Sequence, residues 1–205
     1  MYQLEGAIFY WVFWGFWIYL TFILEKQNPY RLKLAAIVLI VIILSNVQFA
    51  VGEFEIQSSG LFMLSCCYLF ISQEKRGALI YFFICSFTIS IAYVTFHLFE
   101  IFDPIWIIFK KEWMMGITLW YLAILLQKTL KGRLLIVFAG AMQGEILYAF
   151  ILNKFQFPYL IGTFAYFDVC SLTAVMLTGW SLLENAGSIL QNQIHFFEKG
   201  KQKSS

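Results

Sequence analysis

Apolar residues in this chain are gathered into seven long runs that are separated by short polar connections. Most of the runs come near the roughly 20 residues that a helix needs to cross the hydrocarbon core of a bilayer. The pattern therefore predicts an all-α, polytopic bundle of seven transmembrane helices. The predicted spans cover residues 8–24, 34–50, 56–71, 78–101, 113–126, 134–152 and 159–183.

Basic residues are distributed unevenly over the connections between these runs. Of the 14 Lys and Arg residues, all except Lys110, Lys111 and Lys154 lie in the first, third and fifth connections or in the C-terminal tail. Membrane proteins retain Lys-rich and Arg-rich connections on the cytoplasmic side. The distribution therefore predicts an N-terminus outside and a C-terminus inside, an orientation that an odd number of spans permits.

Two places in the apolar pattern are less regular. The most apolar part of the third run, residues 61–71, is too short to cross a bilayer at about 1.5 Å per residue. We therefore expect residues 56–60 to supply the outer helical turns of this span. In the fourth connection, Asp103 and Pro104 suit the N-cap and the first position of a short helix, which we expect to form an interfacial or a re-entrant segment.

Composition and the tail define the domain organisation. Hydrophobic residues make up 61% of the chain and charged residues 13%, which predicts one transmembrane domain over residues 1–183. Residues 184–205 carry apolar side chains at helical spacing and then three lysines. This pattern predicts an amphipathic, basic cytoplasmic tail that lies on anionic lipid, or alternatively a docking surface for a cytoplasmic partner. The apolar stripe consists of Leu183, Ala186, Leu190, Ile194 and Phe197.

Two acidic residues inside predicted spans form the first candidate site. The helices that carry Glu145 and Asp168 enter the bilayer from opposite sides. At about 1.5 Å per residue, each acid lies about 14 to 17 Å from the start of its helix, so the two lie at nearly the same depth. Because their helices are consecutive and antiparallel, the two carboxyls can face one another. Gly140 and Gly144 form a GxxxG element beside Glu145, which permits the close approach of another helix.

A charged group at this depth costs about 2.5 to 3.5 kcal/mol on insertion scales and is by default a functional hypothesis. Glu145 and Asp168 in contact would share one proton, because two carboxylates in a dry site cannot both ionise. The pair then serves as a proton or cation relay, or lines a polar pocket. The structural alternative is a protonated pair that, with Gln143 nearby, joins two helices by hydrogen bonds.

A second candidate site lies near the outer end of the fourth predicted span. His97 and Glu100 are three residues apart, which places them within reach of each other on a helix. A ligand site and simple solvation at the membrane interface both explain this pair.

Known catalytic and cofactor-binding patterns do not match this chain. The last predicted helix contains no Lys for a retinal Schiff base, and the two histidines, His97 and His195, are not placed as haem ligands. The HExxH, GxSxG and Walker A patterns are absent. The net charge of +2 is an orientation signal and predicts no nucleic-acid binding. We therefore predict a protein that is not an enzyme and that has no cofactor and no metal site.

The N-terminal region carries a family resemblance. The segment EGAIFYWVFW at residues 5–14 is followed by a helix ending at Glu25 and Lys26, and then by RLKLA at residues 31–35. Together with the overall hydropathy, this arrangement resembles the YphA-type, or SeaA-like, small multipass membrane proteins of endospore-forming Bacillus-group bacteria. The resemblance implies a location in the bacterial cytoplasmic membrane or the forespore membrane and a link to spore envelope assembly. It transfers no catalytic residues.

Two main functions are compatible with the sequence, beside a third, which is a sensor whose outer acidic loops receive a signal. The first is a multipass accessory or assembly factor, whose tail and outer loops contact the lipid bilayer and other membrane or envelope proteins. The alternative is a small proton-coupled or ion-coupled transporter that uses Glu145 and Asp168. Two features that are typical of transporters are missing from the sequence. It shows no apparent internal repeat, and no span is clearly broken by paired Gly and Pro at the midplane.

Overall fold

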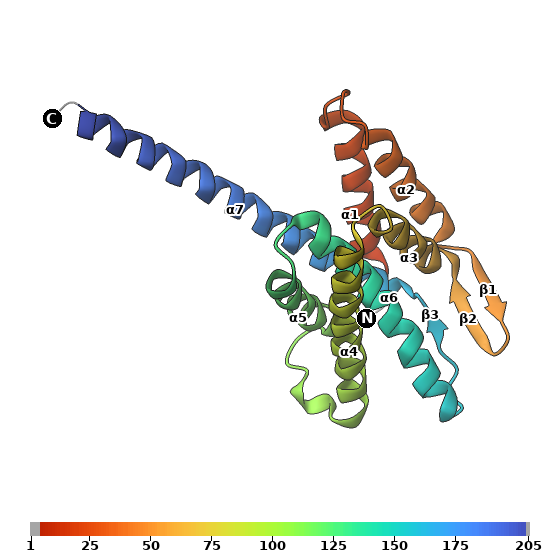
Figure 1. The fold of residues 1–205 in the computed structure, drawn as a ribbon. Helices are drawn as coiled ribbons and strands as arrows, with labels where there is room; N and C mark the ends of the chain where they lie inside the picture. Colours follow the sequence, from red (N-terminus) through yellow and green to blue (C-terminus); the bar gives the residue numbers. More distant parts are fainter. Residues whose placement is uncertain (1–4, 204–205) are drawn as a thin grey trace.

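Each of the seven predicted apolar runs contains one helix. The computed structural model describes the backbone of residues 5–203 and the side chains of residues 5–103 and 105–188. Within the described residues, the predicted number of helices is confirmed, because one α-helix lies in each run (Figure 1). The helices are α1 (Ala7–Ile18), α2 (Arg31–Leu44), α3 (Ser58–Ile71), α4 (Arg76–Phe102), α5 (Lys111–Leu126), α6 (Leu130–Lys154) and α7 (Phe164–Lys203), with a π-helical turn η1 (Tyr19–Ile23) directly after α1.

The helices differ in their ability to cross a membrane alone. Three of those described are long and apolar enough: α4, α6 and the part of α7 over Phe164–Ser188. The continuous segment of α1 and η1 covers Ala7–Ile23, and α3 has 14 residues, so both are shorter than a full span. A 14-residue helix rises only about 21 Å, less than the roughly 30 Å of a hydrocarbon core.

A small sheet corrects the all-α prediction. Strands β1 (Gln48–Val51) and β2 (Phe54–Gln57) form an antiparallel hairpin, and β3 (Leu160–Ile161) pairs in parallel with β2. The hairpin turns at Gly52, whose φ of 62° suits glycine because it has no Cβ. Consequently α2 ends at Leu44 instead of residue 50, and Ile56 and Gln57 are strand residues instead of the first turn of α3.

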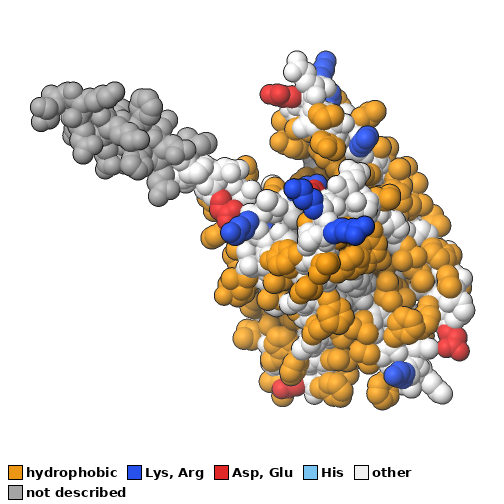
Figure 2. Space-filling view, viewed as in Figure 1, with side chains coloured by type: hydrophobic (Ala, Val, Ile, Leu, Met, Phe, Trp, Pro, Cys, Tyr) orange, Lys and Arg blue, Asp and Glu red, His pale blue; other side chains and the backbone are white. Residues whose placement is uncertain are grey.

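The connections alternate between two ends of the bundle. We call the end that holds the sheet and residues 103–110 and 155–163 the sheet end, and the opposite end, with residues 24–30, 72–75 and 127–129, the basic end. Figure 2 shows hydrophobic side chains over the flank of the molecule and Lys and Arg gathered toward the basic end. Exposed Ile80, Ile84, Phe87 and Ile91 along α4 form an apolar surface suited to lipid contact.

The predicted tail is continuous with the last helix. The backbone of α7 runs as one helix from Phe164 to Lys203 and extends beyond the bundle past the basic end (Figure 1). The side chains that form the predicted apolar stripe from Leu190 onward, and the three terminal lysines, lie outside the described side chains. The predicted short helix after Asp103 is present as a 3-10 turn (Pro104–Trp106), where the Asp103 carboxylate accepts a hydrogen bond from the Ile105 N–H at 3.3 Å.

Candidate functional site

Glu145 is buried at the sheet end, where three donors from different elements converge on its carboxylate. The hydroxyl of Tyr93 on α4 donates to Oε1, and the hydroxyl of Tyr159 donates to the same oxygen at 2.9 Å. The backbone N–H of Gly162 donates to Oε2 at 2.9 Å. Only 1% of Glu145 is exposed, so these bonds replace the water that the carboxylate loses on burial.

Three glycines allow this arrangement. A Cβ on Gly144 would lie 2.8 Å from a ring carbon of Tyr93, so glycine lets the Tyr93 ring pack directly on α6 beside Glu145. A Cβ on Gly140 would lie 2.5 Å from the backbone oxygen of Ser86 on α4. The predicted close approach at the GxxxG element is therefore confirmed, with α4 as the partner helix. Gly162 has a φ of 78°, which turns the chain after β3 and presents its N–H to Glu145.

A cavity of about 480 Å³ adjoins Glu145 between α4, α5, α6 and the start of α7. Its volume lies in the range of small-molecule sites. Glu5 is exposed and Lys111 is partly exposed, so the cavity reaches the surface at the sheet end. The polar and ionisable residues that line it are Glu5, Tyr93, His97, Glu100, Lys111, Glu112, Glu145, Tyr148, Tyr159 and Thr163.

His97 and Glu100 belong to the same cavity as Glu145. His97 Nδ1 lies 3.3 Å from Glu100 Oε2, which confirms the predicted contact, and Lys111 Nζ lies 3.2 Å from Glu100 Oε1. The His97 ring stacks on Tyr148, with ring centroids 4.9 Å apart. Within the described part of the chain, His97 Nε2 has no hydrogen-bond partner. Two sites that the sequence suggested separately are thus one site.

Asp168 has a different role from the one predicted. Its carboxylate accepts hydrogen bonds from the backbone N–H groups of Gly6 and Phe9, both at 2.8 Å, at the start of α1. The donors to Glu145 are other groups, so the predicted pair of facing carboxyls does not form. Gln143 also lies apart from Glu145, because its Nε2 donates to the Tyr68 hydroxyl on α3 at 2.7 Å.

Comparison with known proteins identifies the family. A family model described as "YphA-like integral membrane protein" matches residues 5–203. The chain belongs to this family. It is 29% identical over 204 residues to the "Uncharacterized protein YphA" of Bacillus subtilis (strain 168), an alignment that covers 98% of this chain and 100% of the relative. No solved structure matches the chain.

Membership of an integral membrane family agrees with the apolar helices described above. The matched region includes the residues that line the cavity and all of α7.

Three tyrosines of the site were not among the residues predicted from the sequence. Tyr93, His97 and Glu100 are spaced by four and three residues, and Glu145 and Tyr148 are spaced by three, so each set shares one helix face. This spacing was available as a signal, and it predicts the two facing walls of the cavity. The contribution of Tyr159 and Gly162 depends on the loop before α7, for which helical spacing gives no information.

The chemistry of the lining suits binding. Carboxylates accept hydrogen bonds and hold cations, while tyrosine rings provide apolar faces with a polar tip. In the described residues, no group of three His, Cys, Asp or Glu side chains is arranged to hold a metal ion. The carboxylates are therefore spread around the cavity instead of meeting at one point.

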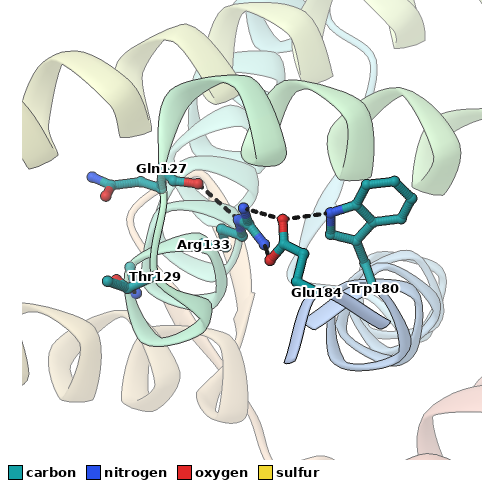
Figure 3. Close-up of polar contacts among 6 residues, drawn as sticks. Gln127, Thr129, Arg133, Trp180 and Glu184 are labelled. Carbon is teal, nitrogen blue, oxygen red and sulfur yellow. Dashed lines mark hydrogen bonds and ion pairs between the residues drawn. The ribbon is translucent and has the colours of Figure 1, made fainter. Parts of the chain in front are cut away.

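A second polar cluster joins α6 to α7 at the basic end (Figure 3). Arg133 donates from Nη1 and Nη2 to the two carboxylate oxygens of Glu184 at 2.8 and 3.1 Å, and from Nε to the Gln127 carbonyl at 2.7 Å. Trp180 Nε1 donates to Glu184 Oε1 at 2.7 Å. This cluster fixes the rotation of α7 where the helix leaves the bundle.

Proposed function

We propose that this chain is a non-catalytic accessory protein of the bacterial cytoplasmic membrane that binds a small molecule in the cavity beside Glu145. The observation that carries the proposal is a buried carboxylate, held by three hydrogen bonds, that adjoins an open volume of about 480 Å³. Ionisable groups inside membrane proteins face cavities where they serve a ligand or an ion. A cavity with a few convergent polar groups is the usual form of such a site.

The cavity favours binding over a purely structural role for Glu145. Hydrogen bonds that only join helices are compatible with close packing, and protein interiors contain few voids larger than a water molecule. Here Tyr93, Tyr159 and Gly162 hold the carboxylate while the space next to it stays open. A side chain held from three directions is suited to recognising a ligand with little reorganisation.

We propose that ligand binding in the cavity serves assembly of the spore envelope. The basic asymmetry supports an orientation with the sheet end, and thus the cavity, outside the cytoplasm. The extended α7 then projects on the cytoplasmic side, where it can contact a partner. The family resemblance supports a link to the spore envelope and, in spore formers, a location that includes the forespore membrane.

A proton-coupled or ion-coupled transporter is the alternative, and the position of Asp168 weakens it. The Asp168 carboxylate caps α1 through two backbone bonds, which is a structural task. Of the two carboxyls that a relay would use, Glu145 is the one that lines the cavity. Solute flux through reconstituted liposomes would favour transport over the accessory role.

Filling the cavity tests the proposal. Ala165 lines the cavity, so Ala165→Phe should occupy part of it, whereas Ala78 is exposed on α4 and Ala78→Phe is the matched control. In a Bacillus subtilis strain that lacks YphA and carries each variant at equal membrane level, we expect Ala165→Phe to lower the yield of heat-resistant spores. Ala78→Phe should behave as the unmodified chain. Full function of Ala165→Phe would overturn the proposal.

A crosslinking measurement tests the accessory role separately. A photoreactive group placed on the exposed face of α7, at Asn185, should capture a membrane or envelope protein in intact cells. If the cavity controls this contact, Ala165→Phe reduces the yield of the crosslinked species and Ala78→Phe does not. Solute flux together with a lack of any protein partner would contradict the accessory role.

A further inference from the structure

We propose that the ligand of this cavity is a small organic cation, a protonated amine or a quaternary ammonium compound, held between the Glu145 carboxylate and the rings of Tyr93, Tyr148 and Tyr159. The proposal rests on the proposed function and adds the chemical class of the ligand. Three observations support it: the charge of the lining, the geometry of the aromatic rings, and the lack of a positively charged partner for Glu145 among the described residues.

The charge of the lining favours a cation. Four carboxylates line the cavity, from Glu5, Glu100, Glu112 and Glu145, against the single ammonium of Lys111. That ammonium is already engaged, because its Nζ lies 3.2 Å from Glu100. A cavity lined mainly by one sign of charge attracts ligands of the opposite sign and raises their local concentration.

The aromatic walls are arranged as a corner. The rings of Tyr148 and Tyr159 are almost perpendicular, at 89°, with centroids 5.0 Å apart. The His97 ring stacks on Tyr148. The centroids of the His97 and Tyr93 rings are 4.8 Å apart. Ring faces carry negative electrostatic potential, so an ammonium within about 6 Å of a centroid is attracted to them. Groups of aromatic rings that surround a ligand are known to recognise alkylated ammonium groups.

Glu145 lacks a positively charged partner among the described residues. Its three donors are two tyrosine hydroxyls and one backbone N–H, all formally neutral. Charged groups buried in proteins are generally paired with a group of opposite charge. An ammonium in the cavity supplies that charge, and the hydroxyl oxygens of Tyr93 and Tyr159 remain able to accept hydrogen bonds from it.

The test compares probes of one shape and different charge. The full-length protein in lipid nanodiscs is titrated by calorimetry with phenethylamine, with the neutral phenethyl alcohol and with the anionic phenylacetate, each at up to millimolar concentration. Tetraethylammonium tests a permanent cation, and calcium tests a simple metal ion. We expect saturable binding of the two organic cations and much weaker binding of the alcohol, the anion and calcium.

Variants locate the bound probe. Glu145→Gln should weaken phenethylamine binding by about tenfold, as expected for the loss of one charge-assisted hydrogen bond. Glu74→Gln at the basic end is its control. Tyr148→Leu should weaken binding more than Tyr148→Phe, which keeps the ring, and Tyr121→Leu on the exposed face of α5 should have no effect. The Tyr148 pair keeps the test valid if Glu145→Gln fails to fold.

The outcomes separate this proposal from the proposed function. Equal or tighter binding of the alcohol, phenylacetate or calcium overturns the organic-cation class, and the cavity remains functional if Ala165→Phe is still defective in cells. Failure of every organic cation to bind also overturns the class. Full function of Ala165→Phe in cells overturns the proposed function itself, whatever the probes do.

Discussion

The carboxylate of Asp168 on α7 accepts the backbone N–H of Phe9 on α1 at 2.8 Å, across 159 residues of sequence. The same carboxylate also accepts a hydrogen bond from the backbone N–H of Gly6. The N–H groups at the start of a helix have no acceptor inside that helix, and Asp168 satisfies two of them. A negative charge at this position also complements the positive end of the helix dipole. Asp168 is therefore a helix cap supplied by another helix.

Removing this cap should destabilise the protein. Asp168→Ala leaves two buried N–H groups without an acceptor, which we expect to lower the free energy of unfolding by about 1 to 3 kcal/mol. Asp168→Asn keeps one acceptor oxygen and should have a smaller effect. Thermal melts of the detergent-solubilised variants measure both. Asp103→Ala is the control, because Asp103 caps an exposed turn. If Asp103→Ala lowered the melting temperature as much as Asp168→Ala, the role of Asp168 as the cap of α1 would be contradicted.

The glycines between α4 and α6 should tolerate alanine poorly. Gly140→Ala forces a methyl group against the Ser86 carbonyl and Ile89, so we expect a loss of about 1 to 3 kcal/mol from overpacking. Gly144→Ala should displace Tyr93 and so weaken the Glu145 site as well. A Cβ on Gly179 meets no atom within 4 Å, and Gly179→Ala should be neutral or slightly stabilising because alanine favours helix. Thermal melts of the three variants measure these effects. If Gly140→Ala and Gly179→Ala changed the melting temperature by similar amounts, close packing of α4 against α6 at Gly140 would be excluded.

The ion pair of Arg133 and Glu184 should contribute more than the exposed pair of Lys131 and Glu74. The Arg133 side chain is 5% exposed, whereas the Lys131 and Glu74 side chains are 60% and 46% exposed. Exposed pairs contribute little to stability, and an Arg left without its carboxylate keeps a charge in a buried position. Glu184→Gln should therefore lower the melting temperature more than Glu74→Gln. Arg133→Lys should also be destabilising, since a lysine cannot form both parallel bonds.

Orientation can be tested with a matched pair of glutamines. Gln156 and Gln73 are both exposed, at the sheet end and the basic end respectively. In a variant whose four native cysteines are replaced by alanine, Gln156→Cys should react with a membrane-impermeant thiol reagent in intact cells. Gln73→Cys should react only after the cells are opened. Labelling of Gln73→Cys in intact cells, with Gln156→Cys protected, would reverse the predicted topology.

The sequence by itself determined the membrane class, the seven helices and several local contacts. Long apolar runs identify helices because a bilayer offers no water to the backbone, so each segment has to satisfy its own hydrogen bonds. The contact of His97 with Glu100 follows from helical spacing alone, and the close packing at Gly140 and Gly144 follows from their lack of side chains. The sequence signals for these features are local: an apolar run, a three-residue spacing, and two glycines one turn apart.

The tertiary structure alone decided the hairpin, the partners of the buried acids and the cavity. Residues 48–57 lie in or beside apolar runs that suit a helix, and they form strands in a sheet that also includes β3, about 100 residues later. Helical rise gives the depth of Glu145 and Asp168, but which way each side chain points depends on how its helix is rotated by packing. That rotation turns Asp168 toward α1 and Glu145 toward Tyr93 and Tyr159. Local spacing cannot specify it, because the rotation is set by contacts between segments far apart in the chain.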